Sequence, residues 1–255
     1  MKIALLGYGR MGHMVEQLAL ATGDSVVAII DAGQENMFDT ESFASADVAI
    51  DFSVPSVAYN LCRAAMQRGK PVVSGTTGWD KELHLLQQEI ITQGWTFLHA
   101  SNFSIGVNLF FALSEEFAKM MDRFPNYRAT MKEVHHRHKL DAPSGTALTT
   151  AKGILVHSSR LSDWYMESEE PSLQSLVERS KDGKKPDDCL PIKVLRQGEE
   201  IGCHSVAYTS DSDSITLTHQ AFDRSGFAQG ALIAARFCLG RSGLFTMKQL
   251  LEEYR

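Results

Sequence analysis

Five nitrogen-bearing side chains stand side by side in the middle of the chain, where residues 133–147 read E-V-H-H-R-H-K-L-D-A-P-S-G-T-A. Neighbouring cationic groups repel one another, so such a run favours a bound acid or phosphate, or a proton transfer that offsets the repulsion. Because the whole chain has a formal net charge of −6, the run indicates a local site for a small anion. Its members are His135, His136, Arg137, His138 and Lys139.

The residues after this run have the pattern of a helix start. Ser144 has the side chain of an N-cap, and the N–H groups of Gly145 and Thr146 would lack partners in the first helical turn. Such N–H groups, at the positive end of the helix dipole, bind anions. The sequence therefore predicts that cationic side chains and a helix N-terminus converge on one ligand.

The geometry of the run limits which of its side chains can meet. In a regular strand alternate residues face opposite sides, so His135 would share a face with Arg137, and His136 with His138. All five can contact one ligand only if the chain bends, and we expect the bend at residues 140–143.

Three interpretations of the run stay open at this point. It could be a solvated polar strand end. It could be a zinc site, although the H-H-x-H spacing is not helical and no cysteine lies nearby in sequence. It could be an acid/base and carboxylate-binding site, which agrees best with the cofactor motif described next. The zinc site would combine His135, His136 or His138 with Glu133 or Asp141.

A glycine motif near the N-terminus is typical of dinucleotide binding. Residues 7–12 match G-x-G-x-x-G, directly after an apolar run and before a helical pattern. The first glycine allows a tight turn, the second lets the backbone approach a pyrophosphate, and the third lets helix and strand pack closely. A purely structural turn is the alternative. The expected cofactor loop comprises Gly7, Tyr8, Gly9, Arg10, Met11 and Gly12.

Asp31 ends the second expected strand, where an acidic side chain can accept hydrogen bonds from both adenosine-ribose hydroxyls. The next residue is Ala32, so no adjacent arginine can bind a 2′-phosphate. We therefore expect NADH to bind at least as well as NADPH. The alternative is that Asp31 only caps a turn.

Two further loops follow expected parallel strands, S-G-T-T-G at 74–78 and H-A-S-N-F at 99–103. Ligands of open α/β sheets lie at the carboxyl ends of the strands. Either loop could be ordinary connecting chain, but together they favour a dinucleotide that lies across the sheet edge.

The elements that must position these residues divide the chain in two. Up to residue 104, short apolar runs alternate with segments of helical period, which indicates an α/β fold with a parallel sheet covered on both faces. Residues 33–46 are expected to form a short linker with one turn. Strands are expected at 3–6, 25–30, 48–52, 71–73 and 95–98, and helices at 11–21, 56–68 and 81–93.

Residues 105–222 are expected to form a separate α+β domain. The polar stretch 158–188 is expected to be a surface excursion. An Ala-rich helix at 225–239 and helical turns at 247–254 are expected to pack residues 223–255 back on the first domain. The other helices are expected at 105–124 and 144–157, and the strands at 127–135, 190–196, 201–209 and 214–221.

The composition is that of a globular protein of roughly two domains, with 255 residues, 44% hydrophobic and 22% charged. The acidic balance argues against nucleic acid or a membrane surface as the general partner. The sequence contains neither a signal-peptide pattern nor a run of roughly 20 apolar residues, so we expect a cytoplasmic protein. Its four cysteines have no metal-binding spacing and are expected to be buried, reduced thiols.

Taken together, these segments resemble the 4-hydroxy-tetrahydrodipicolinate reductases of bacterial diaminopimelate and lysine biosynthesis, a family also called dihydrodipicolinate reductases. The resemblance covers nearly the whole chain and is most specific at residues 133–147. Support comes from residues 7–12, 75–78 and 101–108, from Arg196-x-Gly198 and Gly202-x-His204, and from residues 218–230.

The resemblance implies a Rossmann-like parallel-sheet domain for the cofactor and a second α+β domain, with a mixed sheet, for substrate binding and oligomerisation. It implies a homotetramer that uses NADH or NADPH to reduce a small cyclic dicarboxylate, 4-hydroxy-tetrahydrodipicolinate, to tetrahydrodipicolinate with loss of water. No metal site is expected.

Carried over to this sequence, the resemblance implies that His135 is a proton donor or acceptor and Lys139 the proton donor. His136, Gly145 and Thr146 would hold the substrate. The implied cofactor contacts are residues 7–12, Asp31, Gly75, Thr76, Thr77, Ala100, Ser101, Asn102 and Phe103.

Two features fall outside this interpretation. Ala32 stands where many relatives have a basic residue, and the region between Asp31 and Val48 is short. His204 and His219 are assigned no function and are expected to be satisfied polar groups within a sheet.

Two rival functions remain. An amino-acid or sugar dehydrogenase would also combine a G-x-G-x-x-G domain with an α+β domain. A non-catalytic NADH sensor would bind the dinucleotide without turnover and would have little use for His135 or Lys139.

Overall fold

The computed structural model describes residues 1–181 and 187–254 and divides into two compact units. Unit 1 comprises residues 1–108 and 225–255, and unit 2 comprises residues 109–224. The boundaries expected from the sequence, after residues 104 and 222, lie four and two residues from these.

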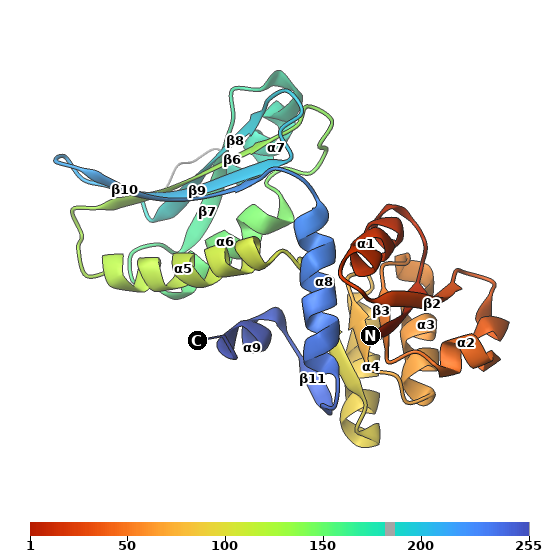
Figure 1. Cartoon of the computed structure of the whole chain (residues 1–255). Coiled ribbons are helices and arrows are strands. Elements are labelled where there is room, and N and C mark those ends of the chain that lie inside the picture. The colour runs from red at the N-terminus through yellow and green to blue at the C-terminus, as the bar shows by residue number, and fades with distance from the viewer. Residues whose placement is uncertain (182–186, 255) are drawn as a thin grey trace. The chain divides into compact units, whose positions relative to one another are not determined.

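Unit 1 is built on a six-stranded sheet in which every pairing is parallel (Figure 1). The strand order is β11-β5-β4-β3-β1-β2. The edge strand β11 was not expected, because three residues are too few to show a pattern and its position depends on pairing with β5. The strands are β1 (Lys2–Leu6), β2 (Ser25–Ile30), β3 (Val48–Asp51), β4 (Val72–Ser74), β5 (Thr96–His99) and β11 (Gly243–Phe245).

Helices cover both faces of this sheet because its strands are apolar on both sides. In β1, Ala4 and Leu6 pack in one core with α3 and α4, whereas Ile3 and Leu5 pack in the other with α1 and α8. The helices of unit 1 are α1 (Arg10–Ala21), η1 (Glu35–Asp39), α2 (Glu41–Ala44), α3 (Pro55–Gln67), α4 (Asp80–Gln93), α8 (Ser225–Cys238) and α9 (Met247–Glu252).

The segment expected to be a linker, residues 33–46, instead contains the two short helices η1 and α2. Phe38 and Phe43 are buried, and their rings pack edge to face. Two aromatic side chains are therefore enough to hold these turns against the core, although the segment has no clear period.

Unit 2 contains a five-stranded mixed sheet of order β10-β9-β6-β8-β7 (Figure 1). β9 is antiparallel to β6 and β10, whereas β8 is parallel to β6 and β7. The expected mixed sheet is therefore confirmed. The strands are β6 (Arg128–His135), β7 (Asp163–Glu167), β8 (Cys189–Arg196), β9 (Gly202–Thr209) and β10 (Ser214–Ala221).

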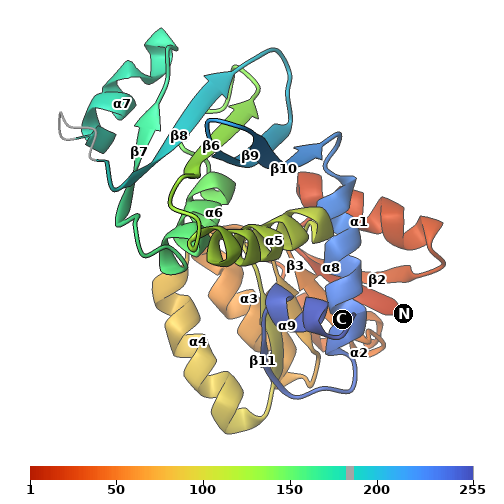
Figure 2. The same cartoon turned by 90° about the vertical axis from the view of Figure 1, so that its left-hand side faces the viewer.

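One face of the mixed sheet is covered by α5 (Ile105–Met121) and α6 (Gly145–Val156) (Figure 2). Cys203 and Cys189 are half-exposed, so the expectation of four buried thiols holds only for Cys62 and Cys238. All four thiols are free.

The expectation of a surface excursion at 158–188 is wrong for most of that stretch. It contains β7, the short helix η2 (Pro171–Leu173) and α7 (Gln174–Lys181). β7 is an edge strand in which only Met166 is fully buried. Its other residues show no alternation of apolar and polar side chains, so the sequence did not indicate a strand. Residues 182–186 of the stretch lie outside the described residues. Among the described residues, no helix is long and apolar enough to cross a membrane.

Candidate functional site

The basic run lies where β6 ends. The last residue of β6 is His135, whose carbonyl accepts the N–H of Gln197 at 2.8 Å. A turn follows at once, in which the N–H of Lys139 donates to the carbonyl of His136 at 3.2 Å. The expected bend at 140–143 is therefore placed too late, because strand pairing with β8 stops at His135.

The five nitrogen-bearing side chains do not all converge. Arg137 and His138 are exposed, and the nearest carboxylate to His138 is that of Glu199, at 3.5 Å. His135 is buried, and His136 and Lys139 are half-buried. The site is therefore built from part of the run only.

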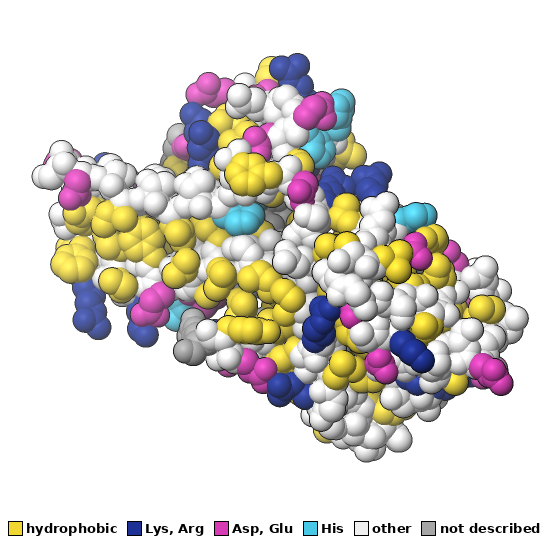
Figure 3. Space-filling view, viewed as in Figure 1, with side chains coloured by type: hydrophobic (Ala, Val, Ile, Leu, Met, Phe, Trp, Pro, Cys, Tyr) yellow, Lys and Arg dark blue, Asp and Glu magenta, His cyan; other side chains and the backbone are white. Residues whose placement is uncertain are grey.

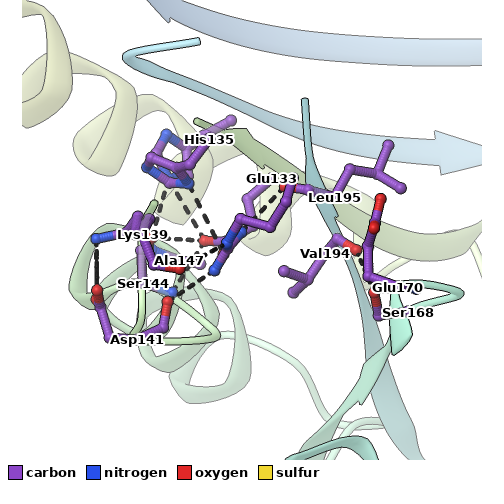
Figure 4. Close-up of polar contacts among 12 residues, drawn as sticks. Glu133, His135, Lys139, Asp141, Ser144, Ala147, Ser168, Glu170, Val194 and Leu195 are labelled. Carbon is purple, nitrogen blue, oxygen red and sulfur yellow. Dashed lines mark hydrogen bonds and ion pairs between the residues drawn. The ribbon is translucent and has the colours of Figure 1, made fainter. Parts of the chain in front are cut away.

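Glu133 is the centre of a buried polar network (Figure 4). Its side chain is fully buried, and its Oε2 accepts the Ser144 N–H at 3.0 Å and the Ser144 Oγ–H at 2.5 Å. Its Oε1 lies 3.4 Å from Nη1 of Arg196. A buried carboxylate is stable when hydrogen bonds and an opposite charge replace water, and this one has both.

Ser144 begins α6 as the sequence predicts. Its Oγ accepts the N–H of Ala147 at 3.2 Å, which makes it the N-cap. Gly145 is exposed and Thr146 half-buried, and the first N–H groups of a helix have no partners within the helix. N–H groups of this kind, at the positive end of a helix dipole, can bind an anion, and here they lie next in the chain after the basic run.

Lys139 carries the cation of the site. Its Nζ donates to Oδ1 and Oδ2 of Asp141 at 2.8 and 2.9 Å, and its side chain is 22% exposed. Burial would raise the pKa of Asp141, but the hydrogen bonds and charge of Lys139 outweigh it and lower that pKa. The ammonium group therefore has a carboxylate partner that another carboxylate could replace.

His135 is neutral at pH 7. Burial, followed by repulsion from the charged form of His204 and from Lys139 and Arg196, lowers its pKa from 6.5 to about 3. A Cβ atom on Gly202 would lie 3.1 Å from His135 Nε2, so glycine at that position leaves the ring its space.

His204 lies in β9 and belongs to the same network; among the described residues its Nε2 has a partner, as expected, and its Nδ1 has none. It faces Glu133 across the β6–β9 pairing, and its Nε2 lies 3.1 Å from Ser144 Oγ. Its ring lies 5.0 Å from the His135 ring. Burial, then the charges of His219 and Lys139, lowers its pKa to about 4. The Gly202-x-His204 motif marked this histidine in the sequence, but only the pairing of β9 with β6 shows that Glu133 is its neighbour.

In the described part of the chain, one group of three potential metal ligands comes together: Glu133, His135 and His204, within 4.8 Å of one another. This set shares His135 and Glu133 with the zinc alternative, and its third member is His204. Glu133 already accepts two hydrogen bonds and faces Arg196. The positive charges nearby oppose a divalent cation, so a hydrogen-bonded network explains the cluster better.

Unit 2 also contains a hollow of about 660 Å³, lined by Tyr127, Arg160 and Tyr208 among others. None of the residues of the basic run or of the α6 N-terminus lines it. Because this hollow contains none of the candidate catalytic residues, we do not assign the active site to it.

In unit 1, the surroundings of the glycines of the first motif agree with the turn and the close packing that the sequence predicts. Gly7 has a φ of +85°, and a Cβ there would lie 2.6 Å from the Cα of Ser53. A Cβ on Gly12 would lie 2.7 Å from the carbonyl oxygen of Gly7. A Cβ on Gly9 would meet nothing within 4 Å, so the backbone there is open to a ligand.

Asp31 follows β2 and is exposed. Its Oδ1 accepts the N–H of Tyr8 at 2.9 Å, which ties it to the glycine loop. The turn-capping alternative and the ribose-binding interpretation are compatible, because a carboxylate has two oxygens and several lone pairs.

A hollow of about 420 Å³ lies at the carboxyl ends of the parallel strands. The sequence analysis missed three residues of this hollow, Phe52, Ser53 and Pro55. They come directly after β3, and no motif in that loop indicated a binding role. Thr76 is 5% exposed, and its Oγ1 has no hydrogen-bond partner in the described structure. The hollow is lined by Gly9, Arg10, Met11, Phe52, Ser53, Pro55, Gly75, Thr76 and Thr77.

Asp51 joins the two loops that border this hollow. It is fully buried, and its Oδ1 accepts the N–H and the Oγ–H of Ser53 at 3.0 and 2.6 Å. Its Oδ2 accepts the Oγ–H of Ser74 at 2.6 Å. One carboxylate therefore sets the positions of the chain after β3 and after β4.

The loop after β5 lies outside the lining of this hollow. Ser101 is exposed, Ala100 and Asn102 are half-buried, and Phe103 is 1% exposed within a core. A Cβ on Gly230 would lie 1.7 Å from the carbonyl oxygen of Phe103, so α8 packs directly on this loop. The Phe103 side chain is therefore a core residue, and a ligand could reach only its backbone.

Comparisons with known proteins agree with one another. The family model for the N-terminus of dihydrodipicolinate reductase matches residues 1–103, and that for the C-terminus matches residues 106–251. A 4-hydroxy-tetrahydrodipicolinate reductase of Christiangramia forsetii is 39% identical over 99% of this chain and 98% of its own length. One from Akkermansia muciniphila is 36% identical over 95% and 94%.

Solved structures show the same fold. A dipicolinate-bound dihydrodipicolinate reductase from Paenisporosarcina sp. TG-14 has a TM-score of 0.72 at 22% identity, with 96% of this chain and 97% of that chain covered. A probable dehydrogenase from Thermotoga maritima has a TM-score of 0.54 at 11% identity, with 99% and 89% covered. At these identities the likeness concerns the fold alone.

Proposed function

The chain belongs to the dihydrodipicolinate reductase family, and from that premise we propose that Lys139 and His135 carry out its reaction. It is an NAD(P)H-dependent oxidoreductase of diaminopimelate and lysine biosynthesis, which reduces 4-hydroxy-tetrahydrodipicolinate to tetrahydrodipicolinate with loss of water. The observation that carries the residue assignment is the meeting of Lys139, His135 and the α6 N-terminus at the end of β6.

The reaction needs a proton as well as a hydride. NADH or NADPH supplies the hydride when bound, and the electron pair released on the substrate must then be protonated. Lys139 is the proton donor, because His135, with its pKa of about 3, holds no extra proton at pH 7. His135 instead offers a neutral ring that can donate one hydrogen bond and accept another.

The substrate is a small dicarboxylate, and the site has separate donors for its carboxylates. The backbone N–H groups of Gly145 and Thr146 would bind one, at the positive end of α6. The Lys139 ammonium group would leave Asp141 and bind the second carboxylate of the substrate, with His136 beside it. Dipicolinate, which the Paenisporosarcina enzyme binds, is a planar diacid of this kind.

We place the cofactor in unit 1, at the carboxyl ends of β1 to β5. The N–H groups at the start of α1 would bind the pyrophosphate, and Asp31 the adenosine ribose. The loops 75–77 and 100–103 would complete the site. The open backbone at Gly9 and the unpartnered Thr76 Oγ1 support this placement.

The experiment is a turnover assay with the purified chain. We expect NADH consumption with the cyclic substrate and none with amino acids or sugars. Lys139→Ala should lower turnover by about several hundredfold, because removal of a transition-state donor costs on the order of 10²–10³. Affinity for NADH should stay normal.

The matched control is Lys132→Ala, since Lys132 is an exposed lysine on β6, the strand that precedes Lys139. Its turnover should stay normal. Full activity of Lys139→Ala would contradict the assignment of the proton donor. Turnover of a sugar or amino acid instead would favour a different dehydrogenase, and NADH binding without any turnover would favour a sensor.

We also propose a cytoplasmic homotetramer assembled through unit 2. Hydrophobic side chains gather over α5 (Figure 3), where Leu109, Leu113 and Met120 are 46%, 54% and 60% exposed. An apolar surface of this kind favours contact with another chain. Sedimentation should give four times the 28.2 kDa of one chain. A monomer at assay concentration would contradict the proposal.

A further inference from the structure

Arg196 and Glu133 form a buried ion pair directly behind the residues that meet the substrate. We propose that this pair positions Lys139 and the N-terminus of α6 for catalysis without itself contacting the substrate. The inference rests on the proposed roles of Lys139 and of the α6 N–H groups, and it adds two positioning residues to them.

Arg196 holds the segment that carries Lys139. Its Nε donates to the carbonyl of Lys139 at 3.2 Å, and its Nη2 donates to the carbonyl of Asp141 at 2.7 Å. Its Nη1 donates to the carbonyl of Leu195 at 3.0 Å. Because the guanidinium group is planar and rigid, these bonds set where the backbone on both sides of Leu140 lies.

Glu133 holds the other end of the same segment. Its Oε2 accepts both the N–H and the Oγ–H of Ser144, the residue that caps α6. The position of the first free N–H groups of α6 therefore follows the position of this carboxylate. Residues 139–144 are held at one end by Arg196 and at the other by Glu133, whose charges lie 3.4 Å apart.

Burial and existing hydrogen bonds separate these two residues from those that act on the substrate. The side chains of Arg196 and Glu133 are 3% and 0% exposed, whereas those of His135 and Lys139 are 8% and 22% exposed. The guanidinium and the carboxylate of the pair already bond each other and the backbone of residues 139–144, so neither is available to an incoming diacid. Their effect on the reaction must therefore pass through the backbone that they hold.

The register of the sheet explains why the two meet. Glu133 and His135 lie on β6, and Arg196 ends β8, which pairs with β6 in parallel so that His135 is opposite Arg196. The side chains of alternate residues share a face, so Glu133 and Arg196 both point toward the α6 side of the sheet. Sequence separation hides this pair, since its members are 63 positions apart in the chain.

The decisive variant is Arg196→Lys. It keeps the positive charge beside Glu133, but a single ammonium group cannot reproduce the planar arrangement of donors that binds both carbonyls. We expect kcat to fall about 100-fold, the loss that a displacement of about 1 Å in a catalytic group can cause. Dipicolinate binding, measured by calorimetry with NADH present, should also weaken. NADH binding should stay normal, because its site lies in unit 1.

The matched control is Arg128→Lys, the same substitution at an exposed position of the same sheet. It should leave kcat, dipicolinate binding and NADH binding unchanged. Glu133→Gln, which keeps the size of the side chain, provides a second variant if Arg196→Lys does not fold. It should lower kcat and dipicolinate affinity together.

A merely structural role predicts a different outcome. Arg196→Lys would then have a lower melting temperature, but its kcat and dipicolinate affinity would be those of the wild type below that temperature, and the inference would be wrong. Lys139→Ala separates this failure from failure of the proposed function. An inactive Lys139→Ala with a fully active Arg196→Lys overturns the positioning role alone, whereas an active Lys139→Ala overturns the premise.

Discussion

His204 should make the stability of this protein sensitive to mild acid. Its folded pKa of about 4 lies below the ordinary value of 6.5, mainly because the ring is buried. The folded protein therefore keeps His204 neutral while the unfolded chain takes up a proton. The stabilisation is fully present above about pH 6.5 and is lost as the pH falls from 6.5 toward 4.

The size of the effect follows from these two pKa values. Between pH 7 and pH 5 the unfolded histidine becomes almost fully protonated, while the folded one stays mostly neutral. At about 1.4 kcal/mol per pH unit, the contribution of His204 to the free energy of unfolding falls by roughly 2 kcal/mol over this interval. That is a large part of the roughly 5–15 kcal/mol that stabilises an ordinary domain.

The perturbation is His204→Gln, whose amide can still contact Ser144 Oγ but cannot titrate. Urea unfolding at pH 7, 6 and 5 should show that the variant loses roughly 2 kcal/mol less than the wild type between pH 7 and 5. His135 is present in both proteins, so the difference reports His204 together with its coupling to the His135 ring. The control is His84→Gln, on the exposed side of α4, which should lose as much as the wild type.

Equal losses in His204→Gln and the wild type would refute this reasoning. They would mean that His204 is either solvated or already protonated in the folded protein. The network around Glu133 would then need another description, with a cationic ring beside the carboxylate.

Three further predictions concern the reaction and the cofactor. Because the pKa of His135 is about 3 in the free enzyme, the pH profile of kcat/KM between about pH 5 and 8 should show no titration of His135 near pH 6.5. A limb near pH 6.5 that is present in the wild type and absent in His135→Gln would contradict a neutral ring. Asp31→Ala should weaken NADH more than NADPH in fluorescence titrations, and equal weakening would show that it does not bind the ribose. Asp51→Asn, which loses a charged acceptor for Ser53 and Ser74, should weaken both dinucleotides about tenfold and leave dipicolinate binding unchanged; a change in dipicolinate binding alone would argue against this local role.

The neutral state of His135 changes how the basic run is understood. The run looked like a set of proton donors, but only Lys139 is both charged and within the site, while Arg137 and His138 are exposed. Burial is the main cause of the low pKa of His135, and Lys139 is the one member of the run that lowers it further. Proton donation therefore depends on the lysine, and the histidine is kept neutral mainly by its burial.

The sequence by itself determined those parts of the protein that depend on nearby residues. The glycines at 7 and 12 predict a turn and a helix start because a backbone position that excludes Cβ is a local requirement. The Ser144 cap and Lys139 lie close to His135 in sequence, so their meeting needed only one bend. The parallel sheet of unit 1 was predictable because its buried strands are short and apolar throughout.

Tertiary structure alone decided which distant residues complete the site. Arg196 and His204 reach Glu133 because β8 and β9 are the strands that pair with β6, and hydrophobic periodicity reports which face a residue lies on but not which strand lies beside it. The same reason explains β7, whose polar edge strand became visible only through its pairing with β8. The lowered pKa values of His135 and His204 are likewise tertiary, since they arise from burial and from charges that the fold brings together.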